Sequence, residues 1–272
     1  MAGELFIVST PIGNLNDITL RAIQTIKDVD FILAEDTRVA RKLLNHLGIK
    51  ANLQSLNEHN ELKKIPIVLS HLSKGKNIAL ICDAGTPLIS DPGFQLVKRA
   101  KKESLRVIPI PGCSAAIAAL TASGIPTDRF YFYGFLPKTK NKRLDALKTL
   151  VTKEESIILY ESVHRLSSSI EDMIKVFGKS HIAVLCKEIT KLHEEFIGND
   201  LEEIRLFLMD NPSKIKGEFT LILNGKESSE EPNTEKIDSI LKELLPMVSV
   251  KVAVKICSIS CLLYTSPSPR DS

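Results

Sequence analysis

Short apolar runs alternate with segments of helical periodicity throughout the first half of this 272-residue chain. The apolar runs are of strand length and lie at 4–9, 30–34, 53–56, 77–81 and 105–110. Between them, helices are predicted at 19–27, just before Gly48, at 62–74, at 94–102 and in an alanine-rich segment ending at Ala122. In the helix at 62–74, Pro66 predicts either a start or a kink. This alternation is typical of an α/β domain with a mainly parallel, doubly wound sheet.

The loops after three of these strands hold most of the residues able to form a site. They span 10–17, 83–93 and 111–115, and the middle loop contains two aspartates, two prolines, two glycines, a threonine and a serine. Ligands bind outside the carboxyl ends of strands in such sheets, so we expect the loops to converge on one crevice. Gly85 and Gly112 either let the backbone approach a ligand or simply form turns, and both interpretations stay open. The sequence has no P-loop and no dinucleotide-binding glycine motif.

The character of the sequence changes near Thr127. Strands are predicted at 129–135, 156–160, 181–186, 190–197 and 218–223, and helices at 164–177, 201–209 and 237–245. The shorter connections favour a second, smaller α/β domain whose mixed sheet contains antiparallel pairs. We therefore assign 1–126 and 127–225 to two domains, and 226–260 to a linker with a truncated helical segment. Residues 261–272 have no periodicity and a Ser-Pro repeat, and they are interpreted as a foreign tail.

Composition limits the setting in which the chain works. Its net charge of +3 permits a nucleic-acid partner without requiring one. No apolar run is long enough to cross a membrane, and the N-terminus lacks the basic start and the cleavage site of a signal peptide. The five cysteines have no paired spacing and no matching set of histidines, so neither a disulfide nor a metal site is predicted. A reducing cytoplasm is the expected location.

Ionisable residues at the predicted strand ends are the candidates for chemistry. Glu35 and Asp36 stand directly before Thr37 and Arg38, where they serve either in proton transfer or in a helix cap with a local ion pair. Lys187 directly follows the strand predicted at 181–186, in a run of alternating charges that is also typical of a solvated face. The basic loop predicted at 136–143 follows an aromatic strand, a combination that indicates RNA contact but also occurs in solvated loops.

Ten short segments taken together resemble one family. They are TPIGNL at 10–15, EDTR at 35–38, EHN at 58–60, the loop at 83–93, PGCSA at 111–115, GFLP at 134–137, YES at 160–162, HR at 164–165, KEITK at 187–191 and KGE at 216–218. Their order is similar to that in the ribosomal-RNA branch of the tetrapyrrole-methylase-like superfamily. Asn14 stands where the tetrapyrrole and corrin branch has aspartate, which favours the RNA branch. Cys113 and Ser162 stand where close relatives more usually have proline.

The resemblance implies a tetrapyrrole-methylase-like fold, a homodimer, and S-adenosylmethionine as methyl donor in a cleft between the two domains. It implies 2′-O-ribose methylation of a cytidine in 16S ribosomal RNA, with the small ribosomal subunit as partner. The residues expected to bind the donor are Pro11, Gly13, Asp83, Gly85, Thr86, Pro87, Ser90, Ser114, Ala115, Tyr160, Gly217 and Glu218. Those expected to contact RNA are Arg38, Lys138, Lys140, Lys142 and Arg143. The helical segment of the family begins at Ser249 and runs into 261–272, which leaves the activity of this chain open.

Methyl transfer from a sulfonium requires that the enzyme position the acceptor oxygen, remove its proton and exclude water. The candidates for proton removal are Glu35, Asp36 and Lys187, because each is ionisable and lies just after a predicted strand, within a family segment. A splayed nucleotide is expected, since a base-paired ribose is poorly accessible. Two alternatives remain open. One is a methyltransferase of the same fold that acts on a corrin, a porphyrin or a protein, and the other is a non-catalytic RNA-binding module.

Overall fold

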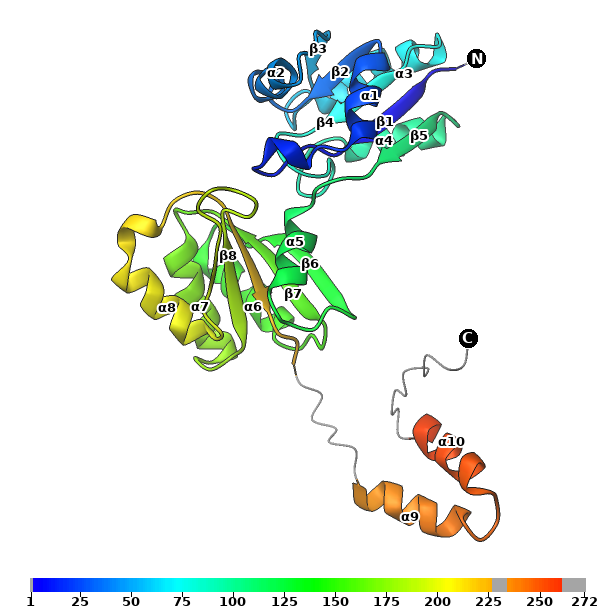
Figure 1. The fold of residues 1–272 in the computed structure, drawn as a ribbon, viewed down its shortest axis with the longest axis vertical. Coiled ribbons are helices and arrows are strands. Elements are labelled where there is room, and N and C mark those ends of the chain that lie inside the picture. The colour runs from blue at the N-terminus through cyan, green and yellow to red at the C-terminus, as the bar shows by residue number, and fades with distance from the viewer. Residues whose placement is uncertain (1, 227–233, 261–272) are drawn as a thin grey trace. The chain divides into compact units, whose positions relative to one another are not determined.

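The computed structural model of the protein describes residues 2–226 and 234–260. It divides into two compact units, Met1–Gly225 and Lys226–Ser272. The first unit contains two five-stranded sheets, each with its own helices (Figure 1). The tail predicted at 261–272 and most of the predicted linker lie outside the described residues. Within the described ranges, no helix has the length and apolar character needed to cross a membrane.

The first sheet is entirely parallel, in the order β3-β2-β4-β1-β5. Its strands are β1 (Glu4–Val8), β2 (Phe31–Ala34), β3 (Leu53–Ser55), β4 (Ile78–Ile81) and β5 (Arg106–Ile110). Every residue of β2 and β4 is buried, as expected of inner parallel strands that helices cover on both faces. The predicted doubly wound parallel sheet is therefore confirmed.

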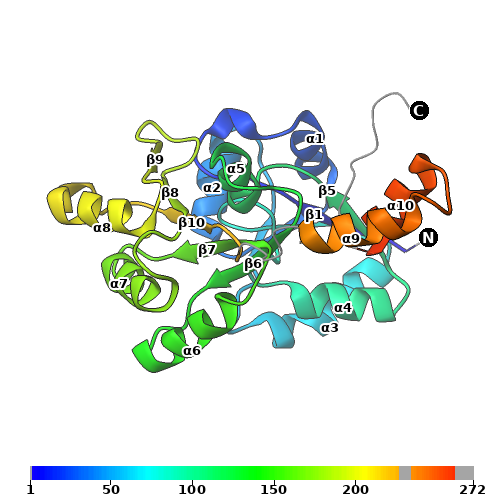
Figure 2. The same cartoon turned by 90° about the horizontal axis from the view of Figure 1, so that it is seen from below.

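Helices pack on both faces of this sheet. They are α1 (Leu20–Asp28), α2 (Thr37–His46), α3 (Glu61–Ser73) and α4 (Phe94–Lys102), with a short 3-10 turn η1 (Leu15–Asp17) before them. Figure 2 shows α1 and α2 on the side opposite α3 and α4. Accordingly, Ile26 and Leu44 belong to one apolar cluster, and Leu72 and Leu96 to the other. Because α3 runs through Pro66, this residue does not start the helix.

The winding of the chain reverses between the adjacent strands β1 and β4. The crossover from β1 leads through α1 to β2, whereas the crossover from β4 leads through α4 to β5 at the other edge. The two crossovers leave on opposite faces, so a crevice opens beyond the carboxyl ends of β1 and β4. Two of the loops predicted to form a site begin at this point.

The second sheet is mixed, in the order β6-β7-β10-β8-β9. Its strands are β6 (Phe130–Phe135), β7 (Ser156–Glu161), β8 (Ala183–Lys187), β9 (Glu195–Ile197) and β10 (Phe219–Leu223). β6 and β7 are parallel, and the other neighbours are antiparallel. The mixed sheet is thus confirmed, although with five strands it is not smaller than the first. β9 is shorter than the strand predicted at 190–197, because the chain turns at Glu188 and Thr190 with φ of +50° and +67°.

Three helices cover one face of the second sheet, and a fourth covers the other. α6 (Lys140–Leu150), α7 (Leu166–Phe177) and α8 (Leu201–Asp210), followed by the turn η2 (Pro212–Lys214), form the first group. α5 (Ala115–Ala122) lies on the opposite face, where Ala116 and Ala119 pack against Ile158 and Ile222. Residues 115–122 fall within the first domain predicted at 1–126, but they pack on the second sheet. α6 also begins inside the predicted basic loop, at Lys140.

The second unit contains the helices α9 (Thr234–Leu244) and α10 (Val250–Ser260). Ala253 and Cys257 of α10 are buried. α9 overlaps the helix predicted at 237–245, and α10 begins one residue after Ser249, where the helical segment of the family is expected to begin.

The first turn of α4 is capped by a side chain from another helix. Its N-cap residue, Gly93, has φ of +118° and no side chain that could accept a hydrogen bond. Instead, the buried carboxylate of Glu61 on α3 accepts a 3.0 Å hydrogen bond from the backbone N–H of Leu96. A charged acceptor at this position also interacts favourably with the helix dipole.

Replacing Glu61 with alanine is expected to lower the free energy of unfolding by about 1.5–3 kcal/mol, because the buried N–H of Leu96 loses a charged partner. Urea denaturation of the two proteins measures the change. Glu103→Ala is the matched control, since the ion pair of Glu103 with Arg99 at the end of α4 is exposed and is worth less than about 1 kcal/mol. Equal losses in both variants would contradict the capping role.

Candidate active site

Hydrogen bonds tie together the three loops that follow β1, β4 and β5. The backbone groups of Thr10 and Gly85 pair in both directions, at 2.8 and 3.1 Å. The hydroxyls of Ser9 and Thr86 lie 3.0 Å apart, and Thr86 donates to the carbonyl oxygen of Cys113 at 2.9 Å. The loops therefore converge, as their positions at strand ends predict.

Gly85 and Gly112, whose roles the sequence does not decide, have different structural roles. Gly85 has φ of +88°, which glycine adopts without steric cost, and it also lines the cavity described below. A Cβ at Gly112 would lie 2.9 Å from the Cβ of Ser9, so this glycine permits close packing of two loops. Gly85 thus adopts a turn conformation in the wall of the cavity, and its approach to a ligand stays a prediction, whereas Gly112 lets its loop pack closely against Ser9.

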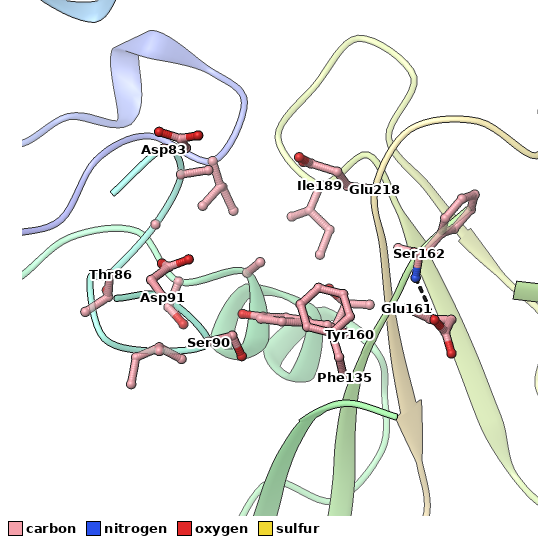
Figure 3. A pocket seen from close by; sticks show the side chains of 18 of the residues that line it. Asp83, Thr86, Ser90, Asp91, Phe135, Tyr160, Glu161, Ser162, Ile189 and Glu218 are labelled. Atoms are coloured by element: carbon pink, nitrogen blue, oxygen red, sulfur yellow. Dashed lines mark hydrogen bonds between the residues drawn. The ribbon is translucent and has the colours of Figure 1, made fainter. Parts of the chain in front are cut away.

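A cavity of about 480 Å³ lies between these loops and the second sheet (Figure 3). Its first wall comes from the three loops and from Glu35 after β2. Its second wall comes from the carboxyl ends of β6 and β7, the start of β10, and Ile189. Figure 3 shows Asp83, Thr86 and Asp91 on one side, and Ile189 and Glu218 on the other. This volume is ordinary for small-molecule pockets, which measure about 300–1,000 Å³.

Nine of the predicted donor-binding residues line the cavity. They are Asp83, Gly85, Thr86, Ser90, Ser114, Ala115, Tyr160, Gly217 and Glu218. Pro11, Gly13 and Pro87 do not line it, and both prolines are at least partly buried in the protein. A Cβ at Gly13 would lie 2.4 Å from the Cγ of Lys191, so Gly13 lets a loop of the first domain approach a loop of the second.

Several cavity residues were not among the predicted ones. Asp91 and Ile89 lie within the predicted loop 83–93, so the loop itself was the signal for them. Ile12 and Ile189 are apolar residues in polar loops, and this pattern is a weaker sequence signal for a cavity residue than a place in the loop 83–93. Phe135 ends the aromatic strand before the predicted basic loop, and its place beside the cavity depends on the pairing of β6.

Tyr160 is held firmly in the second wall. Its hydroxyl oxygen accepts a hydrogen bond from the backbone N–H of Ala116 at 3.2 Å. Its ring meets the ring of Phe132 edge to face, with the centroids 5.1 Å apart. Tyr160 therefore links the start of α5 to β6 and β7, and it fixes the inner surface of this wall.

Three carboxylates line the first wall, from Glu35, Asp83 and Asp91. Burial raises the pKa of Glu35 to about 7, and the charges of Asp91 and Asp83 contribute to the rise. Burial likewise raises the pKa values of Asp83 and Asp91. This wall favours a cationic ligand, and Glu35 exchanges protons near neutral pH. Among the described residues, no group of three or more His, Cys, Asp or Glu is arranged to hold a metal ion.

Asp36 does not line the cavity, although it follows Glu35 in the chain. Its side chain caps α2 by accepting a hydrogen bond from the backbone N–H of Arg38 at 2.8 Å, and it pairs with the guanidinium at 2.6 Å. Hydrogen bonds from Arg38 lower the pKa of Asp36 to about 2. The helix cap with a local ion pair, one of the two interpretations of this segment, is therefore present, and Asp36 is a weak base.

Lys187 lies on the far face of the second sheet. Side chains alternate along β8, with Leu185 in the cluster under α6–α8 and Cys186 in the cluster with Tyr160. Lys187 follows the alternation onto the side of Leu185, where it is buried and lies 3.7 Å from a carboxylate oxygen of Glu195. The face that carries Lys187 is thus opposite the face that carries Tyr160, which argues against a part in proton removal.

Backbone strain is concentrated in the loops beside the cavity. Of the five non-glycine residues with positive φ in the described part of the chain, four lie there: Leu88, Ser90, Glu188 and Thr190. Ligand contacts hold this conformation in many sites, and here internal contacts contribute. Glu188, for example, accepts hydrogen bonds from Lys191 at 2.7 Å and from the backbone N–H of Glu218 at 2.9 Å.

The residues predicted to contact RNA differ in exposure. Lys138, Lys140 and Lys142 are exposed, and the last two lie in the first turn of α6. The side chain of Arg38 is 87% exposed, although it pairs with Asp36.

Arg143 stands apart from these residues because it is buried. It is 4% exposed and donates two hydrogen bonds to one carboxylate oxygen of Asp172, at 2.7 and 3.0 Å. A buried guanidinium paired in this way is not available to a phosphate, which argues against the RNA contact predicted for Arg143.

Comparison with known proteins gives a consistent result. Residues 4–205 match the profile of the family described as Tetrapyrrole (Corrin/Porphyrin) Methylases. The chain is 46% identical over 255 residues to ribosomal RNA small subunit methyltransferase I of Haemophilus influenzae, an alignment covering 94% of this chain and 89% of that protein. It is 47% identical over 229 residues to the protein of the same name from Escherichia coli O157:H7, covering 84% of this chain and 80% of that protein.

Two solved structures share the fold. A diphthine synthase matches with a TM-score of 0.63 and 15% identity, covering 82% of this chain and 90% of that one. A uroporphyrin-III-C-methyltransferase from Thermus thermophilus matches with a TM-score of 0.58 and 17% identity, covering 82% and 94%. The resemblance carried by the ten sequence segments is confirmed by the profile and the curated relatives together. Because the profile covers more than half of the chain and the relatives align with most of it, this chain belongs to the tetrapyrrole (corrin/porphyrin) methylase family, in the group of members named ribosomal RNA small subunit methyltransferase I.

Proposed function

We propose that this methyltransferase transfers a methyl group from S-adenosylmethionine to the 2′-hydroxyl of a cytidine in 16S ribosomal RNA. The observation that carries the proposal is the cavity, which lies beyond the switch point of the first sheet and is closed on its other side by the second sheet. The relatives in the same group are named for the small-subunit ribosomal RNA on which they act.

The cavity suits S-adenosylmethionine in size and in charge. Its 480 Å³ fall within the usual range for small ligands. Glu35, Asp83 and Asp91 offer negative charge to a donor that carries a sulfonium and an ammonium group. Gly85 and Ala115 line the cavity with little side-chain bulk, so a ligand can approach the backbone there. The bound donor supplies a methyl group already activated for in-line attack.

Glu35 is the proposed general base. Of the three candidates for proton removal, it is the one that lines the cavity. Its pKa of about 7 keeps a large fraction ionised at neutral pH and still leaves it basic enough to accept a proton. Glu35 takes the proton of the 2′-hydroxyl as that oxygen bonds to the methyl carbon and the carbon–sulfur bond breaks. The sulfur keeps the bonding electron pair, and protonated Glu35 then releases its proton to solvent.

The proposed RNA contacts are Arg38, Lys138, Lys140 and Lys142. α6 has two lysines and no acidic residue in its first turn, an arrangement that the helix dipole disfavours by a few tenths of a kcal/mol or more. A phosphate bound at this end would relieve the repulsion and would meet free backbone N–H groups as well.

Replacing Lys138, Lys140 and Lys142 together with alanine is expected to weaken RNA binding and to reduce its salt dependence. For every phosphate that the variant no longer neutralises, the slope of log K against log salt should fall by about 0.7–0.9. Filter binding of 16S RNA at several salt concentrations measures this slope. A triple variant at Lys98, Lys101 and Lys102, which are lysines on the surface of α4, is the control of equal charge. If both variants change the slope equally, the effect is one of net charge and the proposed contact is excluded.

The proposal is tested with labelled S-adenosylmethionine and small subunits from cells that lack this activity. We expect heat in a calorimetric titration of the protein with the donor, label in the RNA, and a single 2′-O-methylated cytidine on mapping. Transfer to a corrin or porphyrin but not to RNA would favour the first alternative. RNA binding without any heat or thermal shift from the donor would favour a non-catalytic module.

We further propose that the protein acts as a homodimer in the cytoplasm. Free thiols at the four described cysteines are in keeping with a reducing compartment. Light scattering at low concentration tests the dimer, and a single mass equal to one chain would exclude it.

A further inference from the structure

An irregularity in β6 decides which face of the second sheet carries Phe135. In its pairing with β7, Phe132 lies opposite Ile158, but the next partner, Leu159, lies opposite Gly134. One residue of β6 is therefore skipped, and Gly134 has φ of +79°, as in a bulge built on glycine.

The bulge brings two phenylalanines to the same side. Residues 132 and 135 are three apart, so a regular strand would direct their side chains to opposite faces. Here both rings contact Tyr160 edge to face, with centroid distances of 5.1 Å for Phe132 and 5.6 Å for Phe135. The bulge thus turns Phe135 toward the cavity, and Figure 3 shows its ring beside Tyr160.

Phe135 is the outermost of the aromatic residues in the cavity wall. Phe219 is buried and Tyr160 is half-buried, but Phe135 is 51% exposed. The contact with Tyr160 holds its ring in place, and Tyr160 is itself held by the N–H of Ala116. The bulge therefore skips one pairing position of β6. In return it places a fixed aromatic surface, half exposed to solvent, at the border of the cavity.

We propose that Phe135 is the platform on which the base of the target nucleotide stacks, an inference that rests on the proposed function. An RNA strand must reach the cavity from solvent, so its splayed base meets the exposed part of the wall first. Aromatic side chains bind unpaired bases through their ring faces, whatever the base. Lys138 lies three residues after Phe135 and is the first of three exposed lysines, followed by Lys140 and Lys142. Their positive charges suit the phosphates on either side of that base. Phe135 is thus a positioning residue that places the ribose, and Glu35 acts on its hydroxyl.

The test compares three variants with the wild type in methylation of small subunits that lack the modification. Phe135→Ala is expected to lower kcat/KM for the subunits about 10- to 100-fold, mainly through KM, and to leave the affinity for S-adenosylmethionine unchanged in calorimetry. Phe135→Trp should restore most of the loss, because it keeps a ring face. Phe130→Ala is the matched control, since Phe130 lies on the same strand, is 44% exposed and does not line the cavity.

The outcomes separate this inference from the proposed function. If the wild type binds the donor but does not methylate the subunits, the proposed function itself fails. If the wild type is active and Phe135→Ala keeps its kcat/KM, the platform is excluded. A loss of donor affinity in Phe135→Ala would show that the ring serves the donor, and it would overturn the proposal equally. A loss in Phe135→Trp as large as in Phe135→Ala would mean that ring stacking is not what matters.

Discussion

Glu35→Gln is expected to lower the rate of methyl transfer about 100- to 10,000-fold. Glutamine keeps the shape of glutamate but cannot accept the proton of a hydroxyl group. Single-turnover assays with labelled donor isolate the chemical step from product release. Glu58→Gln is the control, because Glu58 is an exposed acid near Glu35 that does not line the cavity, and its variant should keep most of the activity. An unchanged rate in Glu35→Gln would remove Glu35 from the mechanism.

The dependence on pH tests the same role independently. Burial and neighbouring charges raise the pKa of Glu35 from 4.5 to about 7. Activity of the wild type should therefore rise about tenfold per pH unit below pH 7 and level off above it, and Glu35→Gln should lose this rise.

Stability should change in the opposite direction to activity. Because the pKa of Glu35 is higher in the folded protein, ionisation of Glu35 destabilises the fold progressively from pH 4.5 to about pH 7. Glu35→Gln should consequently melt at a higher temperature than the wild type at pH 8 and show no gain at pH 4. A variant that is both more stable and less active cannot owe its low activity to misfolding.

Arg143→Met is expected to lower the free energy of unfolding by about 3 kcal/mol, since it takes the partner from a buried carboxylate. The side chains of Arg143 and Asp172 are only 5% and 2% exposed. In the variant, Asp172 keeps its ion pair with the ammonium of Lys175, which lies 2.9 Å away on the exposed side of α7. Urea denaturation measures the loss, and Lys142→Ala, one residue away but exposed, should show almost none.

A double variant identifies the cause of this loss. Arg143→Met with Asp172→Leu should regain most of the stability, because no buried charge is left without its partner. The pKa of Asp172 is raised by burial, but hydrogen bonds from Lys175 and Arg143 lower it by more, so the net shift is downward. The stability that the pair contributes is therefore present at neutral pH and is lost as the pH falls through this lowered pKa. Reduced RNA affinity in Arg143→Met with unchanged stability would restore the RNA contact predicted from the sequence.

Lys142 is exposed and Arg143 is buried, a difference that was not predicted from the sequence. Both belong to one basic run, and as members of a loop they would be equivalent. The structure begins α6 at Lys140, so Arg143 shares a helix face with Leu147 and Leu150, at spacings of four and three residues. Helical periodicity therefore contained the signal for a buried Arg143, but it could be used only once the start of the helix was known.

Lys187 and Phe135 illustrate a second limit. Alternation along a strand predicts which residues share a face, but not which face borders a cavity. Lys187 is the last residue of β8, and Glu35 directly follows β2, so both lie at strand ends. The face of β8 that carries Lys187, however, lies under α6–α8. For Phe135, even the alternation fails, because the bulge at Gly134 shifts it by one position.

The sequence by itself determined the parallel first sheet, the mixed second sheet and the three loops that form the first wall of the cavity. Buried parallel strands are continuously apolar, and the loops at their carboxyl ends must share one edge, so both features follow from local pattern. Only the tertiary structure decided which ionisable groups meet the cavity and which are used in packing. Glu35, Asp36, Arg143 and Lys187 are all charged residues in the sequence. Burial and the nearest partner of each residue depend on segments far apart in the chain. They make Glu35 a candidate base and Asp36 a helix cap. They make Arg143 part of a buried ion pair and Lys187 a side chain on the far face of the second sheet.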